Sequence, residues 1–296
     1  MSDEAAPHRA GVVALLGLPN AGKSTLLNRL VGERLAIVTH KPQTTRSRIL
    51  GIVSRPDAQL LLVDTPGVHV GHGALHDVMQ KAVDEALGDC DVALLLVDLA
   101  RGWEERHDVL RDRLDAADKP WLLVGTKSDL PKARDRTWPP EGSGQPDAVF
   151  RIAADKGHGT PTLLDAVVAR LPESPPYYPG DEITDRPLRF LAAEMVREAA
   201  FQELSDELPY DLAVEVEEFD ESRPDLARIR ANLLVRRASQ KGMVIGAAGR
   251  QIKAIGTRAR KSLEKFMGQK VHLELWVKVD PDWFKKHKRL NSLGYF

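Results

Sequence analysis

The feature that most constrains this chain is the stretch GLPNAGKSTLLN, residues 17–28, which follows the apolar run VVALL. Gly17 and Gly22 are separated by four residues, and Lys23 and Ser24 come directly after the second glycine. A strand, such a loop and then a helix is the context of a phosphate-binding P-loop. Its backbone N–H groups and helix N-terminus surround the β-phosphate, its lysine reaches the β- and γ-oxygens, and its serine binds Mg²⁺. The sequence therefore predicts a nucleoside triphosphate site, made by Gly17, Pro19, Asn20, Ala21, Gly22, Lys23, Ser24 and Thr25.

Two later segments, each after an expected strand, indicate which base is bound. They are GTKSD, residues 125–129, and RIAADKG, residues 151–157. Asp129 can accept hydrogen bonds from N1–H and the exocyclic amine of guanine, a donor pair that adenine does not present. The prediction is therefore GTP rather than ATP, with a base pocket made by Thr126, Lys127, Asp129, Ala153 and Ala154.

Two segments between the P-loop and the base pocket have the character of switches. LLLVDTPG ends a strand with Asp64, which can hold Mg²⁺ through water, and places Gly67 where its N–H can sense the γ-phosphate. The segment 41–46, KPQTTR, offers Thr44 and Thr45 as ligands in the triphosphate state. The expected magnesium ligands are thus Ser24, Thr44, Thr45 and Asp64, and the residues expected to act in hydrolysis are Asn20, Lys23, Thr45 and Gly67.

The chain is long enough for two domains, because 296 residues exceed the usual size of one. Apolar runs alternate with amphipathic stretches in the first half, which predicts a doubly wound α/β domain with a mostly parallel sheet over residues 8–173. Five prolines in residues 172–187 disfavour helix or sheet and predict a linker at 174–187. A smaller α+β domain is expected over 188–296, in the order helix, two strands, short helix, long helix, strand.

Charge is distributed unevenly along the second half. Residues 181–225 carry 4 basic and 15 acidic residues, whereas 226–296 carry 17 basic and 4 acidic. The basic block indicates a polyanionic partner, nucleic acid or an anionic membrane surface, unless the two blocks neutralise each other in the fold. The single cysteine, the lack of a secretory signal and the lack of a long apolar run favour a soluble protein of the reducing cytoplasm.

The basic block contains the loop Gly246-Ala247-Ala248-Gly249 between two expected helices. It resembles the GxxG loop of KH domains, which lets nucleic-acid phosphates approach the backbone beside a groove for about four unpaired bases. The residues expected to bind RNA are Lys241, Ile245, Gly246, Ala247, Ala248, Gly249, Arg250, Lys253 and Lys286. KH loops often carry a lysine between the glycines, and its absence here shifts phosphate contact toward Arg250 and Lys241. In the tail, Trp283, Phe284, Leu290 and Leu293 can either stack on bases or pack a last helix onto the sheet.

Together, GLPNAGKSTLLNRLVG, KPQTTRSRILGI, DTPGVH and the basic second domain resemble the Era family of GTPases, from about residue 10 to the final LGYF. The resemblance implies a P-loop GTPase domain followed by a type II KH domain. It implies binding of 16S ribosomal RNA near its 3′ end and assistance to 30S subunit assembly, with GTP or GDP and Mg²⁺ bound. The expectation includes a monomer and peripheral contact with the inner face of the cell membrane.

Two departures from the family pattern, and one difference from Ras-like enzymes, carry expectations of their own. The family usually has Asn where Thr126 stands, so guanine-nucleotide affinity is expected to fall below the family norm. It tends to Ser-Ala where this chain has Ala153-Ala154, but the Ala154 N–H that would meet guanine O6 is retained. Ras-like enzymes have a water-orienting glutamine where Val68 stands, so slow hydrolysis is expected, and Asn20 matches a position at which related GTPases coordinate K⁺.

Two other function classes remain open at this stage. One is a regulatory GTPase whose basic end binds anionic lipid, which would need a broad apolar helix face. The other is a nucleotide kinase, which would need a lid and a second substrate pocket that the first domain does not indicate. His69, His72 and His76 form a weak metal motif, for which a loop of solvated histidines is the preferred interpretation.

Overall fold

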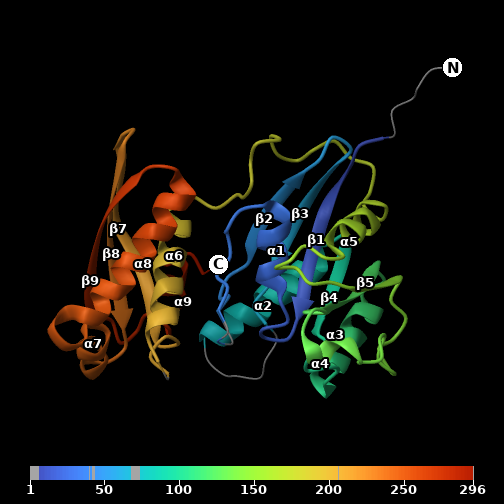
Figure 1. Ribbon diagram of the computed structural model, residues 1–296, viewed down its shortest axis with the longest axis horizontal. Coiled ribbons are helices and arrows are strands. Elements are labelled where there is room, and N and C mark those ends of the chain that lie inside the picture. Colours follow the sequence, from blue (N-terminus) through green and yellow to red (C-terminus); the bar gives the residue numbers. More distant parts are fainter. Residues whose placement is uncertain (1–6, 40, 42–43, 68–73, 206, 296) are drawn as a thin grey trace. The chain divides into compact units, whose positions relative to one another are not determined.

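A computed structural model describes residues 7–39, 41, 44–67, 74–205 and 207–295 (Figure 1). By its contacts the chain divides into two compact units, with the main boundary between Asp185 and Arg186. The described residues of 37–44 and 74–78 group with the second unit, although the sequence assigns them to the first domain. No helix within the described ranges is long and apolar enough to cross a membrane.

The first unit is built on a six-stranded sheet, in the order β2-β3-β1-β4-β5-β6. All neighbouring strands are parallel except β2, which runs antiparallel to β3, so the predicted mostly parallel α/β sheet is confirmed. Every residue of β3, β4 and β5 is buried, as their unbroken apolar runs indicate. The sequence did not predict β2. The strands are β1 (Arg9–Gly17), β2 (Ile49–Ser54), β3 (Ala58–Asp64), β4 (Val92–Asp98), β5 (Trp121–Thr126) and β6 (Ala148–Arg151).

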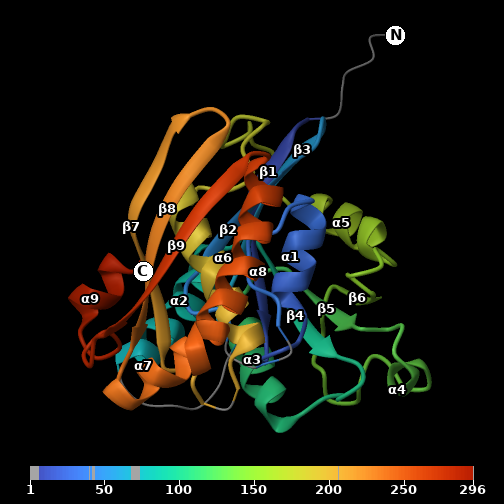
Figure 2. The ribbon, with the colours of Figure 1, turned by 60° about the vertical axis from the view of Figure 1, so that its left-hand side comes forward.

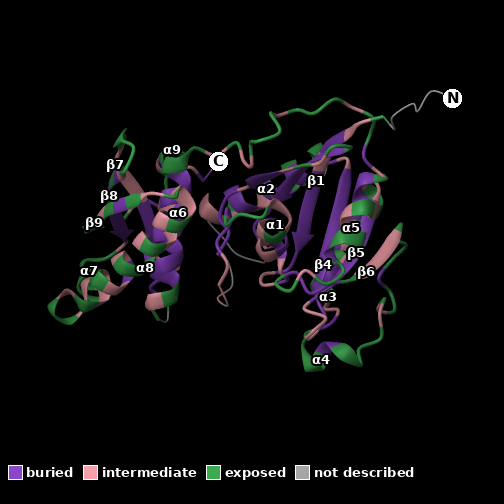
Figure 3. Cartoon of the chain, turned by 45° about the horizontal axis from the view of Figure 1, so that its top comes forward, coloured by how far each residue is buried: buried purple, intermediate pink, exposed green. Residues whose placement is uncertain are grey.

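The helices of this unit pack their buried faces against the strands and leave their outer faces exposed, as Figure 3 shows. The segment 131–147 begins with a one-turn helix. The linker contacts the sheet, because Gln59 accepts the N–H groups of Tyr177 and Tyr178 and Ile52 N–H donates to the Ile183 carbonyl. The helices are α1 (Lys23–Val31), α2 (Ala74–Asp89), α3 (Glu105–Ala116), α4 (Pro131–Arg134) and α5 (Thr160–Val168).

Helix α3 begins with a capping box whose second member is a histidine. The Glu104 N–H donates to Nδ1 of His107 at 2.9 Å, and the His107 side chain is buried. Burial lowers the pKa of His107, since the charged imidazolium loses its hydration. A protonated Nδ1 could not accept this hydrogen bond and would instead face the Glu104 carbonyl oxygen, 3.1 Å away, so the bond from the Glu104 N–H requires the neutral ring.

We compare the free energy of unfolding at about pH 7.5 and at about pH 5.5. Acidification is expected to lower it by about 1 kcal/mol more in wild type than in His107→Gln, because an N-cap usually contributes about this much. A histidine with a lowered pKa contributes stability above its unfolded-state pKa that is lost as the pH falls, whereas glutamine does not titrate. Urea unfolding of both proteins at each pH measures the effect, and carboxylate titration cancels in the difference. A pH-independent difference would contradict it.

The second unit packs two helices on one face of a three-stranded sheet, seen most clearly in Figure 2. The order is β7-β8-β9, with β7 and β8 antiparallel and β8 and β9 parallel. Its core joins α6 and α8 to the sheet through Val196, Ala200, Ile255, Ala259 and Leu233, among others. The predicted element order is confirmed. The elements are α6 (Leu188–Glu203), β7 (Leu212–Arg223), β8 (Leu226–Val235), α7 (Ala238–Ile245), the 3₁₀ turn η1 (Ala247–Gly249), α8 (Arg250–Met267), β9 (Lys270–Val279) and α9 (His287–Ser292).

Part of the charge asymmetry is neutralised inside this unit. Five acidic residues of the first block pair with five basic residues of the second: Glu203 with Arg258, Asp211 with Arg236, Glu215 with Arg289, Glu217 with Lys278, and Glu218 with Arg230. Among the described residues, the ion pairs do not extend to the basic residues around the GxxG loop, residues 246–249. Lys241, Arg250 and Lys253 are exposed and form no ion pair with any described residue.

The apolar residues of the tail pack rather than face solvent. Trp283 and Leu290 are fully buried and Leu293 nearly so, in one cluster with Ala213 and Leu234. These three side chains are therefore unavailable for stacking on bases. Phe284 lies in contact with the guanidinium of Arg236, 3.8 Å from the ring centroid.

Candidate nucleotide and nucleic-acid sites

The P-loop joins β1 to α1 through backbone conformations that glycine favours. Gly17 has φ of 148° and Gly22 has φ of 95°, and a Cβ at Gly17 would lie 2.5 Å from the Leu96 carbonyl oxygen. Asn20, between them, also has positive φ, at 65°. No side chain caps the N-terminus of α1 and its first turn has no acidic residue, so its N–H groups suit an anion.

Lys23 occupies the concave side of this loop. Its ammonium donates to the carbonyl oxygens of Gly17 at 3.0 Å and Leu18 at 3.1 Å. Burial lowers the pKa of Lys23 to about 8, and the charge of Asp64 partly opposes that shift. Lys23 forms no ion pair with any residue that the structure describes, so a phosphate in the loop would give this buried cation a direct charged partner.

Oxygen atoms from three segments meet beside Lys23. Ser24 Oγ donates to Asp64 Oδ2 at 2.5 Å, and Thr45 Oγ1 lies 3.1 Å from Ser24 Oγ and 3.4 Å from Asp64 Oδ2. The second carboxylate oxygen, Oδ1, is buried without a hydrogen-bond partner in the described chain. Burial raises the pKa of Asp64 to about 6. Carboxylate and hydroxyl oxygens are the ligands Mg²⁺ prefers, so this donor set, with its unsatisfied oxygen, fits a magnesium ion.

The two switch threonines differ in what they contact. The Thr44 hydroxyl donates to the Lys41 carbonyl at 3.0 Å and makes no contact with Ser24 or Asp64 among the hydrogen bonds of the described residues. Of the predicted ligands, the structure brings together Ser24, Thr45 and Asp64. Gly67 lies against the P-loop, since a Cβ there would be 2.7 Å from backbone atoms of Pro19. Val68, His69 and His72 lie outside the described residues.

The residues predicted to form the base pocket lie at or just after the ends of β5 and β6. Asp129 accepts a hydrogen bond from Lys156 at 2.8 Å, which lowers the pKa of Asp129. Lys127 has φ of 55° and its ammonium donates to Asp98 at 2.7 Å. Ala153 N–H donates to the His158 carbonyl, whereas the Ala154 N–H makes no hydrogen bond within the described ranges and can meet a guanine oxygen. Asp98 and Lys156 were missed from sequence. Asp98 ends the strand ALLLVD, the same position that marked Asp64.

Thr126 makes the connection for which the family uses asparagine. Its hydroxyl donates to the Ala21 carbonyl at 2.7 Å and lies 3.2 Å from the Val97 carbonyl. The base-pocket strand and the P-loop are therefore joined by this side chain. The expectation that affinity falls below the family norm stays a prediction.

Thr126→Val, which keeps the shape and removes the hydroxyl, is expected to weaken GDP binding about tenfold. The loss has two parts, the hydrogen bond and the buried Ala21 carbonyl left unsatisfied. Isothermal titration of both proteins with GDP measures it, with Thr126→Asn as the restoring variant. Equal affinity of all three would mean that this connection does not support the pocket.

The GxxG loop separates α7 from α8 in the second unit. Gly246 and Gly249 have φ of 71° and 74°, and Ala248 between them has φ of 51°. A Cβ at Gly249 would meet no atom within 4 Å, so its surroundings are open to a ligand. Lys241, Arg250 and Lys253 flank the loop on the adjoining helices. Lys286 precedes α9 as its N-cap residue and pairs with Asp282 at 2.8 Å, so it is not brought into this group by any described contact.

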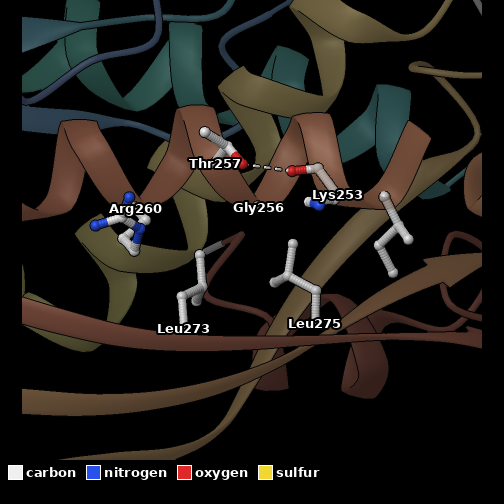
Figure 4. A pocket seen from close by; sticks show the side chains of 7 residues that line it. Lys253, Gly256, Thr257, Arg260, Leu273 and Leu275 are labelled. Atoms are coloured by element: carbon white, nitrogen blue, oxygen red, sulfur yellow. Dashed lines mark hydrogen bonds between the residues drawn. The ribbon is translucent and has the colours of Figure 1, made fainter. Parts of the chain in front are cut away.

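Behind the loop, α8 and β9 border a groove of about 320 Å³ (Figure 4). Leu273 and Leu275 of β9 make its apolar floor, and Lys253 and Arg260 of α8 lie on the opposite side. Thr257 donates to the Lys253 carbonyl at 2.8 Å. An apolar floor with a cationic border suits unpaired bases joined by phosphates. Its lining residues are Ile252, Lys253, Gly256, Thr257, Arg260, Leu273 and Leu275.

Comparisons with known proteins identify the family to which each unit is similar. The model of the family described as 50S ribosome-binding GTPase matches residues 12–127, and that of the KH domain matches residues 207–284. The chain is 43% identical to the GTPase Era of Nitratidesulfovibrio vulgaris, with 97% of each chain covered, and 43% identical to that of Stenotrophomonas maltophilia, with 99% of each covered.

Two solved structures are similar over nearly the whole chain. One is Era in complex with MgGDPNP and nucleotides 1506–1542 of 16S ribosomal RNA, with a TM-score of 0.90, 36% identity, and 97% of this chain and 99% of that chain covered. The other is a variant of Aquifex aeolicus Era bound to GDP and AlF4⁻, with a TM-score of 0.88, 34% identity and the same coverage.

Proposed function

The chain belongs to the Era family of GTPases, and from this premise we propose that it is a GTP-driven switch whose second unit binds the 3′ region of 16S ribosomal RNA and assists 30S subunit assembly. It is a GTPase with a KH domain. The observation that carries the RNA proposal is the open GxxG loop with an apolar groove beside it. Lys241, Arg250 and Lys253 lie around the loop, exposed and without an ion pair among the described residues.

The nature of the RNA is supported by the relative whose structure covers the whole fold. That protein binds nucleotides 1506–1542 of 16S ribosomal RNA. The family model of the first unit is described by a 50S-binding activity, but it matches only residues 12–127 and includes no part of the KH domain. The small subunit is therefore the proposed target.

Hydrolysis is proposed to depend on positioning and charge. Lys23 and the α1 N-terminus hold the β- and γ-phosphates, Gly67 senses the γ-phosphate, and Asp129 with Ala154 selects guanine. Ser24, Thr45 and Asp64 would hold magnesium, which when bound neutralises charge on the phosphate oxygens. Buried Asp64 favours its ionised form once a cation is nearby, and its hydrogen bond orients the Ser24 hydroxyl.

We propose that Asn20 supplies an oxygen ligand for K⁺ at the loop. Its left-handed backbone, with φ of 65°, sets it apart from the neighbouring loop residues Pro19 and Ala21, and an amide oxygen suits a hard cation. Hydrolysis measured in KCl and in NaCl at equal ionic strength is expected to be faster in KCl. Equal rates, or a K⁺ effect retained in Asn20→Ala, would contradict this role.

We propose that the chain acts as a monomer in the cytoplasm, with any membrane contact peripheral and made by the same exposed cations. Sedimentation velocity of the GDP and GTP-analogue forms tests the monomer. Flotation with vesicles containing about 30% phosphatidylglycerol tests the membrane contact, since exposed Lys and Arg each add about 1 kcal/mol near such a surface.

RNA selectivity tests the proposed function. A labelled single-stranded RNA copying the 3′ end of 16S ribosomal RNA is titrated with GTP-analogue-loaded protein, beside a scrambled RNA of equal composition and a 23S fragment of equal length. The 16S sequence is expected to bind at least about tenfold more tightly, because base contacts add to phosphate contacts. Equal binding that falls steeply with salt would mean a general polyanion surface.

A further inference from the structure

Helix α6 carries a fully buried cation. Arg197 has no solvent exposure, and its Nε and Nη2 donate to the two carboxylate oxygens of Glu194 at 2.7 and 2.5 Å. A buried ion pair of this kind need not stabilise the fold, because the cost of removing both charges from water offsets their attraction. The pair is better explained by a specific contact that it makes.

That contact is with the switch segment, defined here as the described residues of 37–44. Arg197 Nη2 also donates to the Thr44 carbonyl oxygen at 2.7 Å. Arg197 Nη1 is buried and has no acceptor in the described chain, so the fork is not fully satisfied by Glu194 and Thr44. The guanidinium is thus held by one carboxylate and directed at one backbone oxygen of the switch segment.

Two further contacts attach the same segment to α6. Val38 N–H donates to Glu198 Oε1 at 3.0 Å. The Lys41 ammonium donates to the carbonyls of Phe201, at 2.7 Å, and Leu204. These carbonyls lie in the last turn of α6 and at its C-cap, where helical partners are lacking and a cation is favoured by the helix dipole.

The carbonyl group that Arg197 orients belongs to the peptide bond between Thr44 and Thr45. The Thr44 carbonyl and the Thr45 nitrogen share one planar peptide unit, so fixing the carbonyl direction limits where Thr45 can point. In this arrangement the Thr45 hydroxyl lies at Ser24 and Asp64. The segment attached to α6 and the threonine beside the phosphate site are therefore adjacent along the chain.

We propose that Arg197 is a positioning residue that holds the switch segment on α6 so that the Thr45 hydroxyl is presented to the triphosphate-bound magnesium. The inference rests on the proposed role of Thr45 as a ligand. Linkage makes the effect reciprocal, because whatever favours attachment of 37–44 to α6 also favours the GTP form. GDP binding does not need Thr45, since the P-loop and base pocket hold it, so the effect is selective for the triphosphate.

The test compares the affinities for a non-hydrolysable GTP analogue and for GDP, in excess Mg²⁺, across matched variants. Arg197→Met is expected to weaken the analogue about 10–20-fold while GDP affinity stays within about twofold. In the same variant, the Mg²⁺ concentration needed for half-maximal hydrolysis is expected to rise. Arg189→Met, on the same helix but bonded to the Val216 carbonyl of the sheet, is the control and is expected to leave both affinities unchanged.

Lys41→Met is a second test, which does not depend on whether Arg197→Met disturbs the packing of α6. Lys41 is outside the α6 core, so its loss leaves Arg197 and Glu194 in place, and the same selective loss is expected at a smaller size. Thr45→Ala tests the proposed ligand separately, and combining it with Arg197→Met should add no further loss of analogue affinity.

The outcomes are distinguishable. If Thr45→Ala keeps the analogue affinity of wild type, the proposed ligand role fails. If Thr45→Ala loses it but Arg197→Met and Lys41→Met both keep it, the ligand role stands and the positioning role is overturned. Equal weakening of GDP and analogue in Arg197→Met would likewise overturn it, because a general structural defect does not discriminate between nucleotides.

Discussion

Lys23→Met is expected to lose GTP hydrolysis by about 10³-fold or more, while the nucleotide-free variant unfolds at a temperature equal to or above that of wild type. The loss follows from removing the one side-chain cation inside the P-loop, which would stabilise charge on the phosphate oxygens. The stability follows from burial, because a lysine pKa lowered to about 8 means that the fold disfavours the charged amine by about 3 kcal/mol. Met fills similar volume without that cost.

The stability difference between wild type and Lys23→Met should depend on pH in one direction. Since the folded-state pKa of Lys23 lies below its unfolded value of 10.5, wild type carries the full penalty below about pH 8 and loses it as the pH rises toward about 10.5. The stability advantage of Lys23→Met should shrink over that interval. Removing Lys23 also takes away the charge that favours ionised Asp64, so the pKa of Asp64 should rise further above its usual value.

Calorimetric unfolding and a phosphate-release assay measure both halves of this prediction. Lys81→Met, at an exposed ion pair with Glu85 on α2, is the matched control and should change neither. A clear fall in unfolding temperature for Lys23→Met would mean that the buried ammonium stabilises the empty loop, and retained hydrolysis would remove Lys23 from the mechanism.

Asp129→Asn is expected to weaken GTP by about 10²–10⁴-fold and to favour xanthosine triphosphate instead. Guanine offers two donors to one carboxylate, and each charge-assisted bond contributes about 1.5–3 kcal/mol. An asparagine amide presents one donor and one acceptor, which complements the C2 carbonyl and N1–H of xanthine. Lys156 would lose its partner at Asp129 but is exposed and returns to water.

Competition of both nucleotides against a fluorescent GDP measures this change in specificity. Asp98→Asn removes the charge beside Lys127 at a residue that is not predicted to read the base, so it is the control and should weaken both nucleotides alike. If Asp129→Asn also weakened both equally, Asp129 would support the pocket without reading the base.

The phosphate and base sites could be predicted from sequence because their chemistry is local. Gly17 and Gly22 are needed for backbone conformation, and Asp64 and Asp129 stand at or just after the ends of buried strands, where a parallel sheet gathers its ligands. The KH element order was likewise readable from hydrophobic periodicity. Strand β2 could not be predicted in this way. Its sequence, ILGIVS, comes soon after the switch segment, and no turn signal marks where the loop ends and the strand begins.

Other parts depend on contacts between distant residues, which no short pattern records. Arg197 occurs in an ordinary helical stretch, and only the fold places it at Thr44, 153 positions away. The distinction between Thr44 and Thr45 depends on backbone direction, and Lys286 was grouped with the RNA residues only because it is basic. The tail aromatics had two equally consistent interpretations until packing showed Trp283 buried.

We propose that GTP controls the binding of RNA at the GxxG loop. The most direct measurement is the dissociation constant of the 16S 3′-end RNA with GDP and with a GTP analogue, for wild type and for Gly249→Asp. Gly268→Asp is the matched control, because Gly268 ends the same helix with φ of 68° and equally open surroundings, so backbone strain is the same. Tight binding only in the GTP form, lost about 10²-fold in Gly249→Asp but kept in Gly268→Asp, is the predicted result. Binding that ignores both nucleotide and loop would contradict it.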